Sequence, residues 1–335
     1  MASPPLSILM PARNAQAFVG EALESLLGQT FGDFELMAVD DASTDGTGSL
    51  LADAARRDRR VRVVKGPGRG ICAALNAGLE LCRAPLVARM DADDVALPQR
   101  LACQVAELER RPELAGVGSR VEIFPRKELT EGLKAYESWL NAIESPADVR
   151  RERFIESPLV HPATVVRAAV LREVGGWHDD GWPEDYALWL ELIARGYPLA
   201  NLPEVLLRWR DGPQRLTRTS PAYSPAAILR LKAHYLARGP LAAGRCIVWG
   251  AGKTGRALIR ALAVEGMGVE LLVDVDPAKI GHPLQGVDVV APQSLGGFNG
   301  VHLVAAVGTR GARALIREHL AGKGWLEGDQ FTCIA

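Results

Sequence analysis

The chain has 335 residues, of which 48% are hydrophobic and 24% are charged, and its formal net charge is −1. This balance is that of an ordinary globular protein with a sizeable core, and the length favours two domains. Because the overall charge is close to zero, no global field attracts nucleic acid, and we expect no nucleic-acid partner.

Apolar strands and amphipathic helices alternate through the first 90 residues. The strands are predicted at residues 6–10, 34–39, 61–64 and 86–90, and the helices at residues 18–27, 50–55 and 71–79. This alternation predicts a parallel sheet flanked by helices. Ligands of open α/β sheets bind at the carboxyl ends of the strands. We therefore expect the acids that follow the second and fourth strands to meet in one crevice: Asp40, Asp41, Asp91 and Asp93.

The chain beyond residue 100 completes the first predicted domain and then begins a second one. Residues 101–153 are expected to be mostly helical, with later strands at 163–166 and 205–209 and helices at 183–195 and 228–236. Residues 217–225, rich in Thr, Ser and Pro, predict a loop. A second α/β pattern begins at residue 246. We therefore expect an α/β domain over residues 1–238 and a small Rossmann-like α/β domain over 242–335.

Cysteine usage and hydropathy bear on the compartment. The five cysteines are odd in number and form no C-x-x-C pair: Cys72, Cys82, Cys103, Cys246 and Cys333. This pattern argues against a disulfide framework or a zinc site and fits a reducing cytosol. Residues 1–6 lack the features of a signal peptide, and no apolar run reaches the roughly 20 residues of a membrane helix. We expect a cytoplasmic protein without a transmembrane segment, and peripheral contact with the inner face of the membrane and homo-oligomer contacts stay open.

Asp91-Ala-Asp93 carries the clearest chemistry. Two carboxylates at a strand end can hold a divalent cation against a diphosphate, and oxygen ligands of this kind suit Mg²⁺ or Mn²⁺. The cation would neutralise the charge that builds on a departing diphosphate. Taken alone, the same pair more often marks a solvated turn or a helix cap.

Asp41 and the pair Glu184-Asp185 each have both a chemical and a structural interpretation. Asp41 can accept from the imide N–H of a base such as uracil, or it can serve turn and cap chemistry after its strand. Glu184 and Asp185 lie at a predicted helix start, where acids are favoured by the helix dipole. The chemical interpretation makes Asp185 a general base that deprotonates an acceptor hydroxyl.

Aromatic and basic residues near these acids are less specific. Trp177, Trp182, Tyr186 and Trp189 fit either a sugar-facing wall or, more commonly for each of them, the core. His161, on the predicted acceptor side, is more often a packed histidine. The basic segments 209–210 and 215–218 fit a diphosphate contact or surface charge equally well.

The motifs in their order resemble family 2 of inverting glycosyltransferases, which have the GT-A fold. The resemblance covers about the first two thirds of the chain and rests on several short segments: Pro11-Ala-Arg-Asn14, Val39-Asp-Asp-Ala-Ser-Thr-Asp-Gly-Thr47, Ala74-Leu-Asn-Ala-Gly78, Asp91-Ala-Asp-Asp94 with Pro98 and Arg100, Gly175-Gly-Trp177 and Glu184-Asp-Tyr-Ala-Leu-Trp189. Arg13 stands where Tyr is more usual, and Ala42 where Gly is more usual.

The resemblance implies roles for individual residues. It implies that the donor is bound by Pro11, Arg13, Asn14, Asp41, Gly70, Asn76, Asp91 and Asp93. It implies that Asp91 and Asp93 hold Mn²⁺ or Mg²⁺ and that Asp185 is the catalytic base. The acceptor side would include Glu184, Trp177, Trp189 and His161. Gly70 alternatively fits a glycine at a helix start.

The second domain carries its own motif. Gly250-Ala-Gly252-Lys-Thr-Gly255 follows a predicted strand and opens a helix, and Asp274 ends the next strand, as in dinucleotide-binding folds. The domain resembles the Rossmann-like domains that precede sugar O-acyltransferases and nucleotide-sugar dehydratases, where Asp274-Val-Asp-Pro-Ala-Lys-Ile-Gly281 has a counterpart. It would bind a nucleotide, an NAD-like or a CoA-like group, or serve assembly alone.

Three functions compete on this sequence. The first is metal-dependent, inverting transfer of a sugar from a nucleoside-diphosphate sugar to a hydroxyl of a glycan, lipid-linked or protein acceptor, in cell-surface polysaccharide assembly. The second is a nicotinamide-dependent oxidoreductase that uses the C-terminal domain, which would leave the acids of the first half without a role. The third is a non-catalytic sugar-nucleotide sensor or scaffold.

Overall fold

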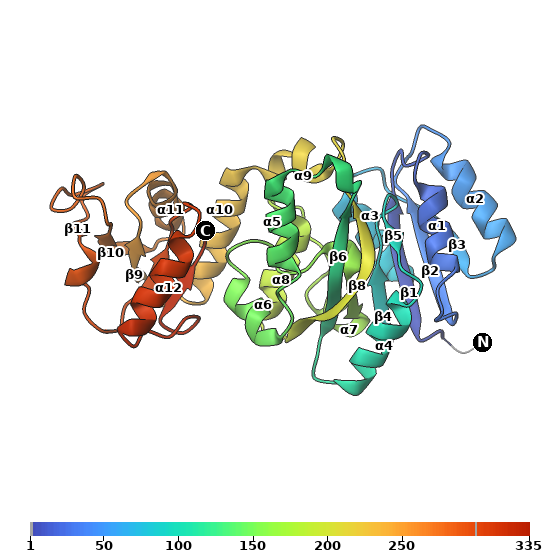
Figure 1. The fold of residues 1–335 in the computed structure, drawn as a ribbon. Helices are drawn as coiled ribbons and strands as arrows, with labels where there is room; N and C mark the ends of the chain where they lie inside the picture. The colour runs from blue at the N-terminus through green and yellow to red at the C-terminus, as the bar shows by residue number, and fades with distance from the viewer. Residues whose placement is uncertain (1–2, 299) are drawn as a thin grey trace. The chain divides into compact units, whose positions relative to one another are not determined.

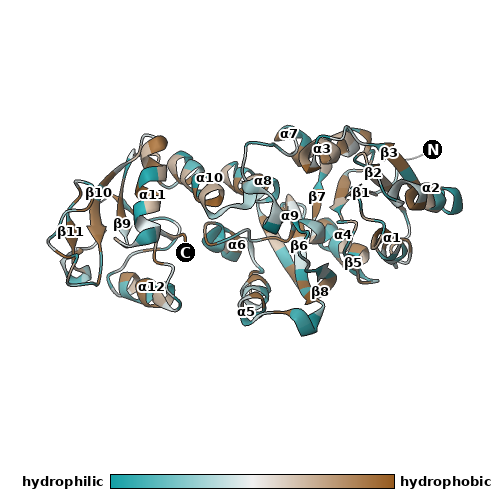
Figure 2. Cartoon of the chain, turned by 90° about the horizontal axis from the view of Figure 1, so that it is seen from above, coloured by the Kyte–Doolittle hydropathy of each residue, from teal (hydrophilic) through white to brown (hydrophobic). Residues whose placement is uncertain are grey.

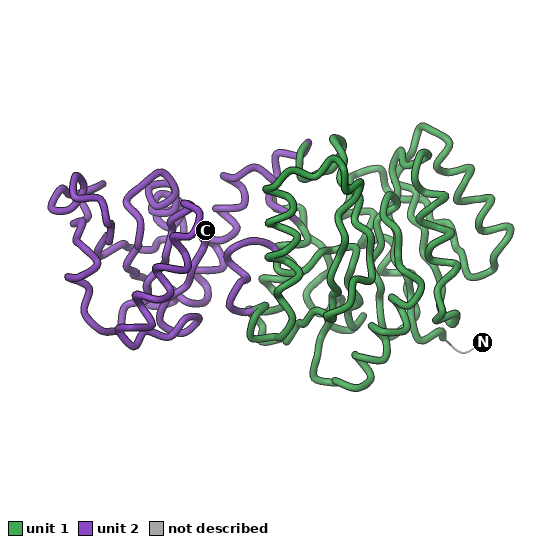
Figure 3. Tube along the Cα trace, viewed as in Figure 1, with its two compact units in different colours: residues 1–149, 158–180, 184–218 green, residues 150–157, 181–183, 219–335 purple. Residues whose placement is uncertain are grey.

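The computed structural model describes residues 3–298 and 300–335. Residues 1 and 2, part of the segment 1–6 in which no signal peptide is expected, lie outside the described residues. Contacts divide the chain into two compact units (Figure 3). Unit 1 comprises Met1–Val149, Pro158–Asp180 and Glu184–Arg218, and unit 2 comprises Arg150–Ser157, Gly181–Pro183 and Thr219–Ala335. The predicted division into 1–238 and 242–335 stays a prediction.

Unit 1 is built on a mixed sheet of eight strands in the order β3-β2-β1-β4-β7-β6-β8-β5 (Figure 1). The four strands from β3 to β4 are parallel, β7 pairs antiparallel to β4 and β6, and β8 runs parallel to β6. The strands are β1 (Leu6–Ala12), β2 (Phe34–Asp40), β3 (Val61–Lys65), β4 (Leu86–Arg89), β5 (Val95–Ala96), β6 (Gly116–Phe124), β7 (Val165–Arg167) and β8 (Leu199–Arg210).

Helices cover both faces of this sheet. They are α1 (Val19–Leu27), α2 (Thr47–Arg57), α3 (Ile71–Leu81), α4 (Arg100–Arg110), α5 (Glu131–Leu140), α6 (Pro146–Glu152), α7 (Ala168–Glu173), α8 (Glu184–Ala194) and α9 (Leu216–Thr219), with 3-10 turns at Arg126–Glu128 and His161–Ala163. None of the described helices of the chain is long and apolar enough to cross a membrane.

The central strand β1 explains why the sheet is covered on both sides. All seven of its residues are buried. Leu6, Ile8 and Met10 join the core formed with α1, α2 and α4, whereas Leu9 joins the core formed with α3, α7 and α8. A strand that is buried at every position is typical of a parallel sheet between two helical layers. The carboxyl ends of β1, β2 and β4 then meet at one edge, as the sequence predicts.

The helical character expected of residues 101–153 is borne out by α4, α5 and α6, but the region also contains a strand that was not expected. The strand β6 lies in this region, between β7 and β8. Its polar residues and two glycines hide the strand pattern, because glycine is rare in strands. The glycines have a packing reason: a Cβ at Gly118 would lie 2.1 Å from Oδ1 of Asn201, and one at Gly116 would lie 3.0 Å from Val166.

Unit 2 contains a parallel sheet of five strands in the order β11-β10-β9-β12-β13. Its apolar strands β9 and β10 are brown in Figure 2. The strands are β9 (Arg245–Trp249), β10 (Gly268–Val273), β11 (Val289–Val290), β12 (His302–Ala305) and β13 (Phe331–Cys333), and the helices are α10 (Pro225–Arg238), α11 (Lys253–Val264) and α12 (Ala312–Gly322), with 3-10 turns at Pro221–Tyr223 and Pro292–Ser294. The unit is a second α/β domain. In the predicted loop at 217–225, α9 and the turn at Pro221–Tyr223 are regular elements.

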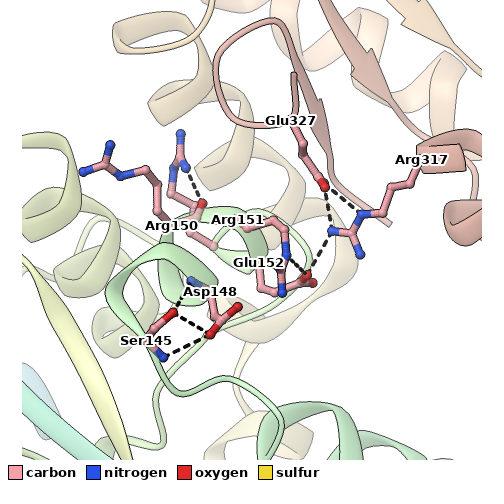
Figure 4. Close-up of polar contacts among 8 residues, drawn as sticks. Ser145, Asp148, Arg150, Arg151, Glu152, Arg317 and Glu327 are labelled. Atoms are coloured by element: carbon pink, nitrogen blue, oxygen red, sulfur yellow. Dashed lines mark hydrogen bonds and ion pairs between the residues drawn. The ribbon is translucent and has the colours of Figure 1, made fainter. Parts of the chain in front are cut away.

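The short segment Arg150–Ser157 packs with unit 2. Arg317 donates to the buried carboxylate of Glu152 over 2.9 Å and to Glu327 over 2.8 Å (Figure 4). Lys232 donates to the carbonyl oxygens of Ile155 and Ile334 over 2.8 and 3.0 Å. These contacts join the segment 150–157 to residues of the C-terminal part of the chain, which explains why it belongs to unit 2.

The packing of α3 on the sheet yields a test of the fold. A Cβ at Gly78 would lie 2.2 Å from Cδ1 of Leu9 and 2.8 Å from Cγ2 of Val39, whereas a Cβ at Gly20 in α1 would meet nothing within 4 Å. We expect Gly78→Ala to destabilise unit 1 by about 1–3 kcal/mol through overpacking. Gly20→Ala, the matched control, should stabilise it by about 0.4–1 kcal/mol. Thermal unfolding of the full-length variants measures both, and equal melting temperatures would contradict the packing argument.

Candidate active site

Asp41 follows the last residue of β2 and lies at the predicted edge of the sheet. It is 3% exposed, and its two carboxylate oxygens accept from the backbone N–H groups of Gly68 and Gly70 over 2.6 and 3.0 Å. A guanidinium nitrogen of Arg13 lies 3.5 Å from the same carboxylate. Gly70 has a φ of +95°, a conformation that favours glycine. Asp41 therefore holds the loop before α3 in place and keeps Arg13 beside it.

The turn after β1 lies against the turn after β2. Pro11 is buried near the end of β1. The side-chain oxygen of Asn14 accepts from the N–H of Thr44 over 2.8 Å, and the N–H of Asn14 donates to Ser43 over 3.0 Å. The three donor-side residues of the first motif are thus brought next to Asp41 by two turns that bind one another.

The acids after β4 form a cluster. One carboxylate oxygen from each of Asp91, Asp93 and Asp94 lies within 4.8 Å of the others. Burial, and then the charge of Asp91, raise the pKa of Asp93 to about 6. The same two causes raise the pKa of Asp94 well above its usual value, and its Oδ2 is buried without a hydrogen-bond partner among the described residues. The cluster holds more negative charge than its own protein surroundings neutralise.

Three arginines frame this cluster. Arg89 is 3% exposed and bonds Asp91 through its guanidinium. Arg100 is fully buried and donates to the carbonyl oxygen of Arg89 over 2.7 Å. Arg210 donates its backbone N–H to Asp94 over 2.7 Å and its side chain to the carbonyl oxygen of Asp93 over 2.6 Å. The backbone that carries the acids is fixed from three elements, β4, α4 and β8.

Arg215 adds a fourth positive charge near the acids. Its guanidinium lies 4.0 Å from the centre of the Trp209 ring and 3.6 Å from the Asp211 carboxylate. Its charge lowers the pKa values of Asp93 and Asp94, against the larger effects of burial and of neighbouring acids. Arg210 and Arg215 come from the two basic segments that the sequence left undecided.

Arg89 also connects the acid cluster to the helix start at Glu184. The charges of both Asp91 and Glu184 favour its protonated form and, with a hydrogen bond to Asp91, outweigh burial and raise its pKa. His161 lies 3.9 Å from Glu184, and burial, then the charge of Arg89, lower the pKa of this histidine well below its usual value. The Nε1–H of Trp177 donates to Nε2 of His161 over 2.9 Å, so the neutral ring carries its proton on Nδ1.

The aromatic residues named on the acceptor side belong to the core. Trp177 and Trp189 are 4% and 0% exposed, and His161 packs edge-on against Trp189. Neither tryptophan offers an exposed face to a sugar in this structure. Glu184 is buried, and Asp185 is half-buried in the first turn of α8.

Asn76 connects two of the sequence motifs. Its side-chain nitrogen donates to the carbonyl oxygen of Trp177 over 2.7 Å, and its oxygen accepts from the N–H of the same residue over 3.0 Å. A Cβ at Gly176 would lie 2.2 Å from that oxygen. The contacts give Asn76 a positioning role for the Gly-Gly-Trp turn, and the donor contact implied for it stays a prediction.

The four residues named in the second domain lie in unit 2. Gly250, Gly252 and Asp274 line one pocket, and Gly255 lies below the turn that the first two form. Among the residues around the acid cluster, sequence reasoning gave no role to Arg89. The one signal was its position, a charged residue inside the apolar run that precedes the two aspartates.

Comparison with known proteins gives the family. The profile described as glycosyl transferase family 2 matches residues 7–175. An uncharacterized glycosyltransferase of Haemophilus influenzae is 31% identical over 213 residues, which are 62% of this chain and 65% of that protein. The amylovoran biosynthesis glycosyltransferase AmsE of Erwinia amylovora is 34% identical over 197 residues, 57% of this chain and 70% of that protein.

Two solved structures share the fold. S. aureus TarS 1-349 in complex with UDP-GlcNAc is 16% identical, with a TM-score of 0.55 over 78% of this chain and 71% of that chain. The mannosyltransferase PcManGT from Pyrobaculum calidifontis, in complex with GDP-Man and Mn²⁺, is 20% identical, with a TM-score of 0.51 over 79% of this chain and 70% of that chain. Unit 1 thus has the GT-A fold, and a second α/β domain follows it. With the family profile matched over half of its length, the chain belongs to glycosyl transferase family 2.

Proposed function

We propose that the chain transfers a sugar from a nucleoside-diphosphate sugar to an acceptor hydroxyl, with inversion at the anomeric carbon and with a divalent cation. The observation that carries the proposal is the carboxylate cluster of Asp91, Asp93 and Asp94 at the end of β4. It lies at the same edge of the sheet as Asp41, because β4 and β2 both pair with β1 in parallel. PcManGT, which shares this fold, binds GDP-Man and Mn²⁺.

The cluster fits a divalent cation by its chemistry. The three carboxylates lie within 4.8 Å of one another, and burial together with their mutual repulsion raises the pKa values of Asp93 and Asp94. The buried Oδ2 of Asp94 has no partner among the described residues. Hard oxygen ligands of this kind suit Mg²⁺ and Mn²⁺. When bound, the cation stabilises the negative charge of the departing diphosphate.

The residues around the cluster supply the remaining roles. Arg13 and Asp41, beside the glycine loop, form the side of the site where a nucleobase fits. Arg215 stacks on Trp209, and its charge acts on Asp93 by lowering the pKa of that acid. It offers a further positive charge to the diphosphate. Asp185 takes the proton of the acceptor hydroxyl as its oxygen attacks the anomeric carbon. The charge of Arg89 interacts with Asp91 in the acid cluster and with Glu184 at the start of α8, next to Asp185.

A donor panel tests the overall proposal. The full chain is incubated with UDP-, GDP- and dTDP-sugars in the presence of Mn²⁺ or Mg²⁺, and release of the nucleoside diphosphate is measured. One donor should be hydrolysed slowly even without an acceptor. Absence of turnover with every donor, together with donor binding, would favour a non-catalytic sensor instead. The panel also identifies the sugar class.

The base assignment predicts the behaviour of Asp185→Asn. Because a positioned general base typically contributes about 10²–10⁴-fold, kcat of transfer should fall by about this factor while the donor affinity is unchanged. Steady-state kinetics and calorimetric donor binding measure the two quantities. Asp180→Asn, an exposed acid shortly before α8, is the matched control and should keep full activity. A transfer rate kept by Asp185→Asn would remove Asp185 from the reaction.

The raised pKa of Asp93 predicts how the metal affinity depends on pH. With a pKa of about 6, the metal-free carboxyl is largely protonated at about pH 5 and ionised at about pH 7. Since a cation must displace this proton, Mn²⁺ should bind at least about tenfold more tightly at the higher pH. Titration calorimetry at both pH values measures the ratio. Asp93→Asn should flatten the dependence, the exposed Asp33→Asn should retain it, and a ratio near one in the wild type would contradict the argument.

The same pKa fixes the sign of a stability effect. The folded metal-free protein holds a proton on Asp93 more tightly than the unfolded chain, in which an aspartate has a pKa of about 3.9. The free energy of unfolding should therefore fall as the pH rises from about 4 to about 6, and Mn²⁺ should reverse the loss. Denaturant unfolding of the metal-free and the metal-loaded protein measures both terms.

A further inference from the structure

Unit 2 contains a pocket that the proposed transfer reaction does not use. Its volume is about 740 Å³, within the range of about 300–1,000 Å³ typical of small-molecule sites. It opens at the carboxyl ends of β9, β10 and β12, and all of its lining residues belong to unit 2. In open α/β sheets this is the position at which ligands bind.

The glycines of the turn after β9 differ in what they permit. A Cβ at Gly255 would lie 1.6 Å from the carbonyl oxygen of Gly250, and one at Gly250 would lie 2.8 Å from that of Ala306, so the packing itself requires these two glycines. Gly252 lines the pocket, has an ordinary φ of −86°, and a Cβ there would meet nothing within 4 Å. The packing gives no reason for a glycine at 252, whereas the close approach of a ligand to the backbone does.

The mouth of the pocket carries one positive charge that no carboxylate neutralises. Lys279 lies 3.2 Å from Asp274 and 3.4 Å from Asp276, which compensate it. Lys253 lines the pocket in the first turn of α11 and forms no ion pair with the described residues. Lys253 and the start of α11 thus belong to the same part of the pocket lining, where a phosphate is favoured.

The remaining walls suit the base and the sugar of a nucleotide. Val275, shortly after β10, and Leu315, on α12, both line the pocket. Their exposed fractions are 71% and 68%. His319 also lines the pocket and stacks edge-on against Trp249, and its Nε2 is enclosed without a hydrogen-bond partner among the described residues. An apolar ring group would cover the first two side chains, and a polar atom of the ligand would satisfy the histidine.

Two features distinguish a mononucleotide from a dinucleotide. Dinucleotide folds join two mononucleotide-binding halves in a sheet of six strands, whereas this sheet has five strands and its last, Phe331–Cys333, is short. Asp274, placed where a ribose-binding acid belongs, already accepts from the N–H groups of Ala251 and Asp276 and from Lys279. A carboxylate has about four lone-pair sites, so one is left for the two hydroxyls of a ribose.

We propose that unit 2 binds a mononucleotide, a nucleoside phosphate or its sugar derivative, with the phosphate at Gly252 and Lys253 and the base toward Val275 and Leu315. This site is separate from the donor site of unit 1. The acids of the pocket, Asp274 and Asp276, are already held by Lys279 and backbone N–H groups, so binding does not require a divalent cation.

The full chain is titrated calorimetrically with UDP, GDP, ADP and NAD⁺ in EDTA. At least one nucleoside diphosphate should bind with one site per chain. Lys253→Glu should weaken it by more than about tenfold, and Gly252→Val should do the same by filling the approach to the backbone. Arg256→Glu, an exposed charge one turn along α11, is the matched control, and Asp93→Asn removes an acid of unit 1; both should keep the affinity. Thermal unfolding verifies that the variants are folded.

Three outcomes would overturn the proposal. They are the absence of any nucleotide binding in EDTA, binding that Asp93→Asn removes and Lys253→Glu leaves intact, and binding of NAD⁺ more than about tenfold tighter than that of ADP. Sugar transfer by the wild type is measured separately. Its failure therefore leaves this proposal standing, and the reverse also holds.

Discussion

The mutual repulsion of three carboxylates at the end of β4 is the constraint on which the site depends. Asp91, Asp93 and Asp94 are held within 4.8 Å, partly or fully out of water, and Asp93 and Asp94 resist ionisation there. Bringing such groups together costs free energy unless positive charge or a proton accompanies them. The fold meets part of this cost with the guanidinium of Arg89 and the backbone N–H of Arg210, and the buried Oδ2 of Asp94 has no hydrogen-bond partner among the described residues.

Arg89 and Arg100 together hold the end of the strand that carries the acid cluster. Arg89 ends a central strand that is buried on both faces, and Arg100 fixes its carbonyl oxygen from α4. The charge of Arg89 acts on Asp91 at one end and on Glu184 and His161 at the other. A change in the charge of the cluster is thus transmitted electrostatically to the first turn of α8. The proposed base, Asp185, belongs to that turn.

The sequence predicted the parallel half of unit 1 because its strands are predominantly apolar and alternate with amphipathic helices. It missed β6, in which glycines and charged residues conceal a strand that pairs with β7 and β8. It placed the acids on one edge of the sheet, since parallel strands bring their ends together. It favoured the core for Trp177 and Trp189 taken singly, and both are buried. It could not predict the contacts of the buried Arg89, because they come from residues distant in the sequence.

The two units present differently charged surroundings to a phosphate group. On the proposed function, carboxylates line the ligand position in unit 1, and a bound cation would reverse the local charge for a diphosphate. In unit 2 the ligand position is lined by backbone N–H groups and by Lys253, which attract a phosphate directly. If both proposals hold, a chelator acts on the first site and leaves the second unaffected. The difference lies in the pairing of the acids, since Asp274 and Asp276 in the second pocket are both compensated by Lys279.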